Sequence, residues 1–348
     1  MGDIKEMLSQ ISLRKEDRRF HRFLWRDLEL DVEPRTYEST RLVFGDTSTP
    51  FLAQKVLLYH AKRHRKRFPE TAHVIKSDIY IDDVMTGAET EEDAAELLNQ
   101  LRNLLHEGGF SIRRWCSNEA RVLDSIPFED RVSTISPKDG TLLPTVKTLG
   151  LTWNAQQDVF AFNSTVRPGG VCTKRIVLSK VSTIFDPLGF LAPFVIRAKI
   201  GIQMCWRLGV GWDDPLPENM AASWKKNWIE ELKQLELTVK RCYREEKKIL
   251  VEASVHTFSD ASEQAYGAVS YLRLVYADET VSVSFIAAKT RVAPLRAVSL
   301  PRLELLGAHL GMQLSTKVGA SLGIPVQQHT FWTDSLKTLY WIRGDSRR

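Results

Sequence analysis

Apolar and polar residues alternate along the stretch from Ser77 to Gly87, and two adjacent acids interrupt the alternation. A period of two predicts a half-buried strand, and the acids predict a hairpin whose tip faces solvent. Neighbouring aspartates repel each other, so Asp82 and Asp83 are candidates to hold a divalent cation, and Mg²⁺ prefers carboxylate oxygens. A solvated turn, where aspartate is common, is the alternative interpretation.

Helical spacing of apolar residues predicts two helices around this hairpin. The first begins near Pro50 and runs into a basic segment, which is either a solvated helix end or a strip that contacts phosphates. The second is capped by Thr90, carries leucines at helical spacing and ends at Gly108. Residues 148–154 and 159–162 read as a further hairpin. We therefore predict an α+β unit over residues 1–165.

Residues 166–250 have a different pattern. Three helices are predicted, over residues 176–184, 194–208 and 218–237, with a breaker-rich turn after the first. Trp224 and Trp228 fall on one face of the third helix, which favours a place in the core over a stacking platform. No catalytic groups cluster here, so the region reads as a helical connector.

The last hundred residues predict the order βββαβα. Asp260 and Asp334 each end a strand, and Glu304 lies in the first turn of a helix that begins at Pro301. The apolar stripe of that helix is predicted to comprise Leu303, Leu306, Leu310, Leu314, Val318 and Leu322. Acids so distributed can converge at one side of a sheet and hold two metal ions.

Composition narrows the class of protein. The 348 residues are 43% hydrophobic and 26% charged, as in ordinary globular proteins. No apolar run is long enough to span a membrane, and the N-terminus does not begin a signal peptide. The four cysteines are widely spaced, which favours free thiols in a reducing compartment over a zinc site. The net charge of +5 permits a nucleic-acid partner without requiring one.

Several motifs together resemble the Pol polyprotein of BEL/Pao-type long-terminal-repeat retrotransposons. Tyr80-Ile81-Asp82-Asp83 matches the Tyr-x-Asp-Asp box of reverse transcriptases, and Asp3 matches the first palm aspartate. The resemblance implies three parts. These are a palm/thumb-like unit over residues 1–165 that lacks the fingers and the strand before Asp3, a Pao-type ("peptidase A17") helical connection over 166–250, and a C-terminally truncated, ribonuclease H-like mixed-sheet domain over 251–348.

The resemblance also implies an activity, namely RNA-directed DNA polymerisation with ribonuclease H cleavage. Two-metal phosphoryl transfer would use Mg²⁺ or Mn²⁺, held by Asp3, Asp82, Asp83, Asp260, Glu304 and Asp334. The expected nucleic-acid contacts are Tyr80, Lys62, Arg63, Arg65, Lys66 and Arg67. The implied partners are an RNA template, a DNA primer, an RNA–DNA hybrid, dNTP and the rest of the Pol polyprotein, with no membrane. We expect an intracellular location, either cytoplasmic, including virus-like particles, or nuclear.

Three hypotheses remain open on function. The chain alone is a weak or inactive polymerase, because parts of the polymerase and of ribonuclease H are missing. Alternatively it is a domesticated remnant that only binds nucleic acid, with salt-sensitive affinity and no turnover. The third is an aspartic peptidase, which needs an Asp-Thr/Ser-Gly loop; the sequence contains none, and Asp186, which precedes a proline, suits helix capping instead.

Overall fold

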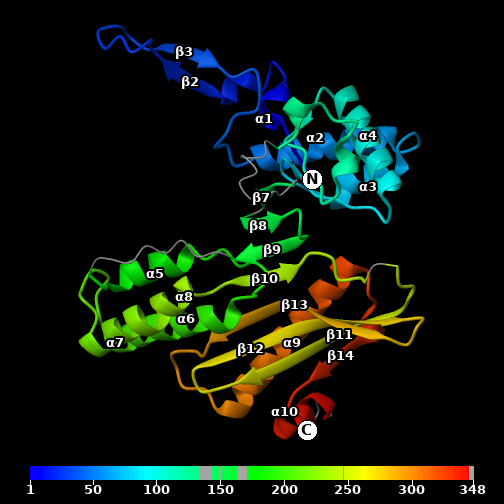
Figure 1. The fold of residues 1–348 in the computed structure, drawn as a ribbon. Helices are drawn as coiled ribbons and strands as arrows, with labels where there is room; N and C mark the ends of the chain where they lie inside the picture. The colour runs from blue at the N-terminus through cyan, green and yellow to red at the C-terminus, as the bar shows by residue number, and fades with distance from the viewer. Residues whose placement is uncertain (133–142, 149, 163–170, 246, 345–348) are drawn as a thin grey trace. The chain divides into compact units, whose positions relative to one another are not determined.

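The computed structural model describes residues 1–132, 143–148, 150–162, 171–245 and 247–344 (Figure 1). The chain divides into two compact units, Met1–Val159 and Phe160–Arg348. Both contain helices and sheets, as the predicted α+β class requires. Among the described helices, none is long and apolar enough to cross a membrane.

A small sheet in the order β4-β5-β1-β6 lies at the centre of the first unit. Its strands are β1 (Gly2–Ile4), β4 (Ile79–Tyr80), β5 (Asp83–Val84) and β6 (Ile112–Arg113). β4 and β5 form the predicted hairpin, and its turn residue Ile81 has a φ of 57°. Asp3 is the middle residue of β1, and the N-cap position of α1 (Met7–Gln10) is occupied by Glu6.

Three helices contribute to the hydrophobic core that this sheet packs against: α2 (Thr49–His64), α3 (Pro69–Ser77) and α4 (Glu91–Glu107). α4 begins and ends as predicted. The Thr90 hydroxyl accepts a hydrogen bond from the Asp93 backbone N–H at 3.1 Å, and Gly109 leaves the helix with a φ of 78°. Leu101 and Leu104 are fully buried, so the leucine stripe read from the sequence is the packing face.

Two hairpins complete the first unit. β7 (Thr145–Thr148) and β8 (Leu151–Asn154) turn at Gly150, whose φ of 81° favours glycine, so the strand predicted over residues 148–154 is interrupted there. β2 (Arg22–Trp25) and β3 (Arg35–Glu38) form a separate two-stranded sheet that the sequence analysis did not predict. Every residue of these two strands is exposed.

The second unit opens with a helical part. It contains α5 (Lys174–Ser182), α6 (Ala192–Arg207), α7 (Glu218–Ser223), a π-helical segment over Trp224–Ile229 and α8 (Glu230–Lys233), and β10 (Leu237–Lys240) is bonded to β9 (Val159–Phe162). Trp224 and Trp228 stack with ring centroids 4.2 Å apart and are 8% and 3% exposed. The prediction that they belong to the core is confirmed.

The turn between α5 and α6 attaches this helical part to the sheet that follows. Both carboxylate oxygens of Asp186 accept backbone N–H groups, from Phe190 at 2.9 Å and from Leu191 at 2.7 Å. Asp186 therefore fixes the turn, but it does not cap a helix as expected, because the N-cap residue of α6 is Leu191, without a side-chain cap bond. Gly189 has a φ of 77° and packs so closely on Ala288 that a Cβ atom would overlap the strand backbone.

The C-terminal sheet is mixed, with the order β13-β12-β11-β14. β11 (Leu250–Ala261), β12 (Ala265–Tyr276) and β13 (Val281–Val292) form the predicted meander, and β14 (His329–Trp332) pairs in parallel with β11. α9 (Leu300–Leu322) connects β13 to β14, and α10 (Leu336–Arg343) follows β14. The predicted order βββαβα is confirmed.

The buried face of α9 differs from the predicted leucine stripe. Leu306 and Leu322 are 37% and 39% exposed, so they do not belong to the packing face. Small residues take their place, because α9 lies very close to β11 and β12. A Cβ atom at Gly307 would lie 3.2 Å from the Asp260 backbone oxygen, and one at Gly311 would lie 3.2 Å from a neighbouring side-chain methyl group. A spacing rule for apolar residues does not detect glycine in this role.

Candidate metal centres

The C-terminal acid cluster consists of Asp260, Glu304 and Asp334. Asp260 lies near the end of β11, and Asp334 lies between β14 and α10. Glu304 is the fifth residue of α9, one residue beyond the first turn in which the sequence placed it, because the helix begins at Leu300. One carboxylate oxygen from each residue lies within 4.8 Å of the other two. β11 and β14 are parallel neighbours, so their C-terminal ends lie at the same end of the sheet. The first residues of α9 lie at that end as well, since Glu304 is close to both aspartates. The structure thus brings these three predicted residues together.

One hydrogen bond caps α10 directly after Asp334, and a second connects α10 to the start of α9. The Ser335 hydroxyl accepts from the Thr338 backbone N–H at 3.3 Å and so caps α10 directly after Asp334. The fully buried Thr338 hydroxyl donates to the Pro301 carbonyl at 3.5 Å. Since Pro301 is in the same helical turn as Glu304, the starts of α9 and α10 are fixed near each other, and with them two of the three acids.

The electrostatics of this cluster fit a cation. Glu304 is 8% exposed, and its Oε2 atom is buried without a hydrogen-bond partner in the described part of the chain. Burial raises the pKa of Glu304, and the charges of Asp260 and Asp334 raise this pKa further. A buried acceptor without a donor costs free energy. The donor set is entirely carboxylate, which suits Mg²⁺ or Mn²⁺. The residues present therefore fit the implied metal.

The N-terminal acid cluster consists of Asp3, Asp82 and Asp83. One carboxylate oxygen from each lies within 4.8 Å of the other two. Asp3 is directly opposite Asp83 across the β1–β5 pair, and the Ile4 backbone N–H donates to the Asp82 carbonyl at 2.8 Å. The hairpin and the first strand are thus held in the register that gathers the acids, although residues 3 and 82 are far apart in sequence.

Like charges opposed across a strand pair are destabilising. Burial raises the pKa of Asp83, and Asp82 and then Asp3 raise it further, while Arg114 opposes the shift. Arg113, opposite Asp3 on the other side of β1, has its Nε atom 3.4 Å from Asp3 Oδ2. These two arginines were not identified from the sequence. The register that pairs Arg113 with Asp3 is set by packing and leaves no signal in the sequence.

The residues expected to contact nucleic acid have different surroundings in the structure. Tyr80 is 59% exposed beside the acids, where it pairs with Asp83. In the basic segment, the Arg67 Nη1 atom forms an ion pair with Glu107 at 2.7 Å, and the Arg63 guanidinium lies 5.8 Å from the Tyr59 ring centre. The side chains of Lys62, Arg65 and Lys66 are exposed. Binding of phosphate by this segment stays a prediction.

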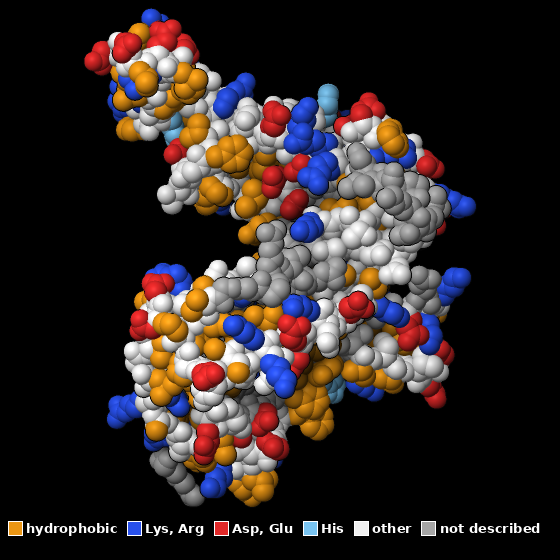
Figure 2. All heavy atoms as spheres, turned by 60° about the vertical axis from the view of Figure 1, so that its left-hand side comes forward, with side chains coloured by type: hydrophobic (Ala, Val, Ile, Leu, Met, Phe, Trp, Pro, Cys, Tyr) orange, Lys and Arg blue, Asp and Glu red, His pale blue; other side chains and the backbone are white. Residues whose placement is uncertain are grey.

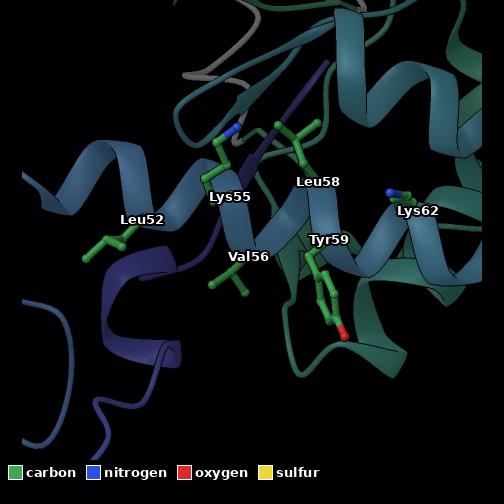
Figure 3. Close-up of a pocket in the computed structure, with 6 residues that line it drawn as sticks. All are labelled: Leu52, Lys55, Val56, Leu58, Tyr59 and Lys62. Atoms are coloured by element: carbon green, nitrogen blue, oxygen red, sulfur yellow. The ribbon is translucent and has the colours of Figure 1, made fainter. Parts of the chain in front are cut away.

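Lys62 also belongs to a surface of α2 that combines apolar and basic side chains. Figure 3 shows Leu52, Val56 and Tyr59 projecting from one side of α2 and Lys55 from another. Leu52 and Val56 are 37% and 38% exposed, and Tyr59 is 62% exposed. Exposed apolar and basic side chains together offer a contact surface on this side of α2.

The mixed sheet, its covering helix α9 and the acids at one edge are consistent with a ribonuclease H-like domain. Residues 173–335 match the family model described as the Pao retrotransposon-like RNaseH-like domain. The match supports assignment of this part to a Pao/BEL retrotransposon Pol protein and a function related to nucleic acid. It includes helices α5 to α8, so the boundary predicted at residue 250 falls inside it. It does not extend to the first unit. The chain matches no curated protein.

Proposed function

We propose that the chain is a retrotransposon Pol protein with two metal-dependent centres for phosphoryl transfer. The first unit would polymerise DNA on an RNA template, and the second would cleave the RNA strand of an RNA–DNA hybrid. One observation supports both assignments: each compact unit gathers three carboxylates to within 4.8 Å from segments distant in sequence.

At the C-terminal cluster, the three side chains would have different tasks. Glu304 is buried and held by the packing of α9, so it would be the fixed ligand of the metal. Asp260 and Asp334 are exposed, so they would present the metal to the scissile phosphate. A bound Mg²⁺ or Mn²⁺ supplies activation of water and stabilisation of the leaving oxygen. Selection of the RNA strand would rest on its 2′-hydroxyl groups and on groove shape.

At the N-terminal cluster, Asp82 is the exposed member and lies at the tip of the hairpin, where a primer end and a dNTP can approach. Asp3 and Asp83 lie behind it, half-buried in neighbouring strands. Metal held there supplies charge stabilisation to the primer 3′-oxygen and the pyrophosphate. Tyr80 on the same hairpin is exposed and would contact the primer end.

The rival functions make different demands on the same residues. A remnant that only binds nucleic acid needs the basic surfaces but not the clusters. A peptidase needs a free catalytic aspartate, whereas both oxygens of Asp186 are occupied by backbone N–H groups of the turn. The peptidase alternative therefore has no support in the described residues.

Cleavage of a labelled RNA–DNA hybrid by the full chain, with Mg²⁺, Mn²⁺ or EDTA, tests the C-terminal centre. We expect metal-dependent cleavage that Asp260→Asn reduces by more than about 100-fold, because even loss of groups that only support metal ligands costs about 10–100-fold. Glu263→Gln is the matched control, since Glu263 is an exposed acid close in sequence that lies outside the cluster. Equal cleavage by Asp260→Asn and wild type would refute this assignment.

Extension of a DNA primer on an RNA template tests the N-terminal centre separately. We expect Asp82→Asn to abolish extension and to leave hybrid cleavage unchanged, because the two clusters belong to different units. Salt-sensitive binding of the same substrates without turnover at either centre would instead favour the remnant.

A further inference from the structure

The β2–β3 hairpin carries three aromatic side chains and one arginine on a single face. Residues directly opposite in an antiparallel pair point to the same side, and the register pairs Phe23 with Tyr37 and Trp25 with Arg35. Phe23, Trp25 and Tyr37 are 50%, 51% and 41% exposed. The hairpin projects from its own unit (Figure 1). We call these four residues the aromatic face of the hairpin.

Local contacts hold the rings of this face in order. Phe23 and Tyr37 stack with ring centroids 5.8 Å apart and planes inclined by 21°. The indole N–H of Trp25 donates to Asp27 Oδ1 at 2.6 Å, which fixes the orientation of the ring. A two-stranded ribbon without a core is only marginally stable in water. These rings are held in a fixed orientation by local contacts and are about half exposed. A ligand that covers them therefore does not have to order them first.

Charge is distributed unevenly along this segment. Cations outnumber acids before the first strand, where Arg14, Lys15, Arg18 and Arg19 flank Glu16 and Asp17. The connecting loop is acidic, with Asp27, Glu29, Asp31 and Glu33. In Figure 2, the projecting hairpin shows exposed hydrophobic side chains together with acidic ones near its tip. A polyanion would therefore contact the two strands and the cations that precede β2, and the acidic loop would repel it.

We propose that the aromatic face binds single-stranded nucleic acid. Bases would stack on the flat rings of Trp25 and Tyr37, and phosphates would meet Arg35 and the preceding cations. The composition of the face favours this ligand over an apolar protein surface, because all three apolar side chains are planar. The aliphatic Leu24 lies on the opposite face. The proposal does not require either acid cluster to be catalytic.

The test is fluorescence anisotropy of a labelled oligothymidylate titrated with the full chain in EDTA. Trp25→Ala is expected to weaken binding by about 5- to 150-fold, the equivalent of ~1–3 kcal/mol for one stacked base. Leu24→Ala is the matched control, because it removes a 68% exposed side chain from the opposite face of the same strand. Its affinity should equal that of wild type. Tyr37→Phe, which keeps the ring, should also bind normally.

A second variant keeps the proposal falsifiable if Trp25→Ala disturbs the hairpin. Arg35→Gln retains all three rings, and it should reduce the slope of log affinity against log salt by about 0.7, as expected for loss of one phosphate contact to a single strand. Unchanged affinity and salt slope in both variants would overturn the proposal. So would a dimer in sedimentation that Trp25→Ala dissociates, since the face would then belong to a second copy. Asp82→Asn should bind the oligonucleotide like wild type, so failure at the polymerase centre is distinguishable.

Discussion

Replacement of Glu304 by glutamine tests whether the C-terminal acid cluster is built for a cation. Gln keeps the size of the side chain, removes its charge and replaces one acceptor oxygen by an NH2 donor, which can face the carboxylates of Asp260 and Asp334. In the metal-free chain, Glu304 is 8% exposed, has one oxygen without a partner among the described residues and faces Asp260 and Asp334. We therefore expect Glu304→Gln to raise the free energy of unfolding in EDTA, in contrast to the loss that a core substitution normally causes.

The magnitude follows from the cost of the buried group. An unsatisfied buried polar group costs about 1–3 kcal/mol, and a charged one costs more, so removal of the charge should stabilise the metal-free chain by about 1–2 kcal/mol. The direction in which this stabilisation changes with pH also follows from the structure. Burial and the neighbouring acids raise the pKa of Glu304 above its ordinary value of 4.5, so its charge costs stability only above about pH 4.5. Below that pH both folded and unfolded chains carry the protonated acid, and the difference between variant and wild type should vanish.

Urea unfolding at neutral pH, in EDTA and in Mg²⁺, measures both effects. Mg²⁺ at ten times its dissociation constant should stabilise the wild type by about 1.4 kcal/mol and Glu304→Gln by much less. Glu263→Gln again serves as the control, with the wild-type response. If Glu304→Gln is less stable than wild type in EDTA and responds equally to Mg²⁺, Glu304 is a structural residue and not a metal ligand.

Three further outcomes are expected from single substitutions. Burial raises the pKa of the Cys116 thiol from 9.0 to about 11, so thermal scans should show stability falling by up to ~2.7 kcal/mol as pH rises from 9 to 11, and Cys116→Ala should remove this loss. Gly189→Ala should destabilise the second unit by more than ~2 kcal/mol in urea, because the new methyl group overlaps β13, whereas Gly201→Ala, in open space on α6, should be neutral or stabilising. Lys66→Ala should weaken oligonucleotide binding in anisotropy more than Arg67→Ala, because Arg67 is already paired with Glu107.

The sequence was most informative where regular spacing and burial coincide. Strands of the C-terminal sheet alternate clearly, so their order and the approach of Asp260 to Asp334 could be predicted. The buried face of α9 could not. Its contact depends on Gly307 and Gly311, which let the helix approach the sheet, and no hydrophobic pattern marks a glycine that is chosen for close approach.

In the first unit, the sequence indicated the hairpin at Asp82 but not what surrounds it. β1 contains only three residues, too few for an alternation to be recognised, so the strand that holds Asp3 could not be predicted from the hydrophobic pattern. The pairing of Arg113 with Asp3 depends on strand register, which tertiary packing sets. The β2–β3 hairpin was missed because its strands are exposed on both faces, and a strand without a buried face has no period-two signal.

The two acid clusters offset the repulsion of their carboxylates by different means. In the first unit, Arg113 lies 3.4 Å from Asp3, and the Asp82 side chain is exposed to water, so much of the repulsion is relieved without a metal. In the second unit, Glu304 is buried with an unpartnered oxygen in the described structure. Burial and neighbouring acids raise the pKa of half-buried Asp83 as they do that of Glu304, but water screens exposed charges far better than buried ones, so the cost of a missing cation should be larger at the buried Glu304. The C-terminal centre is therefore the one whose folding should be coupled to the cation, and the N-terminal centre can be fully folded before the cation binds.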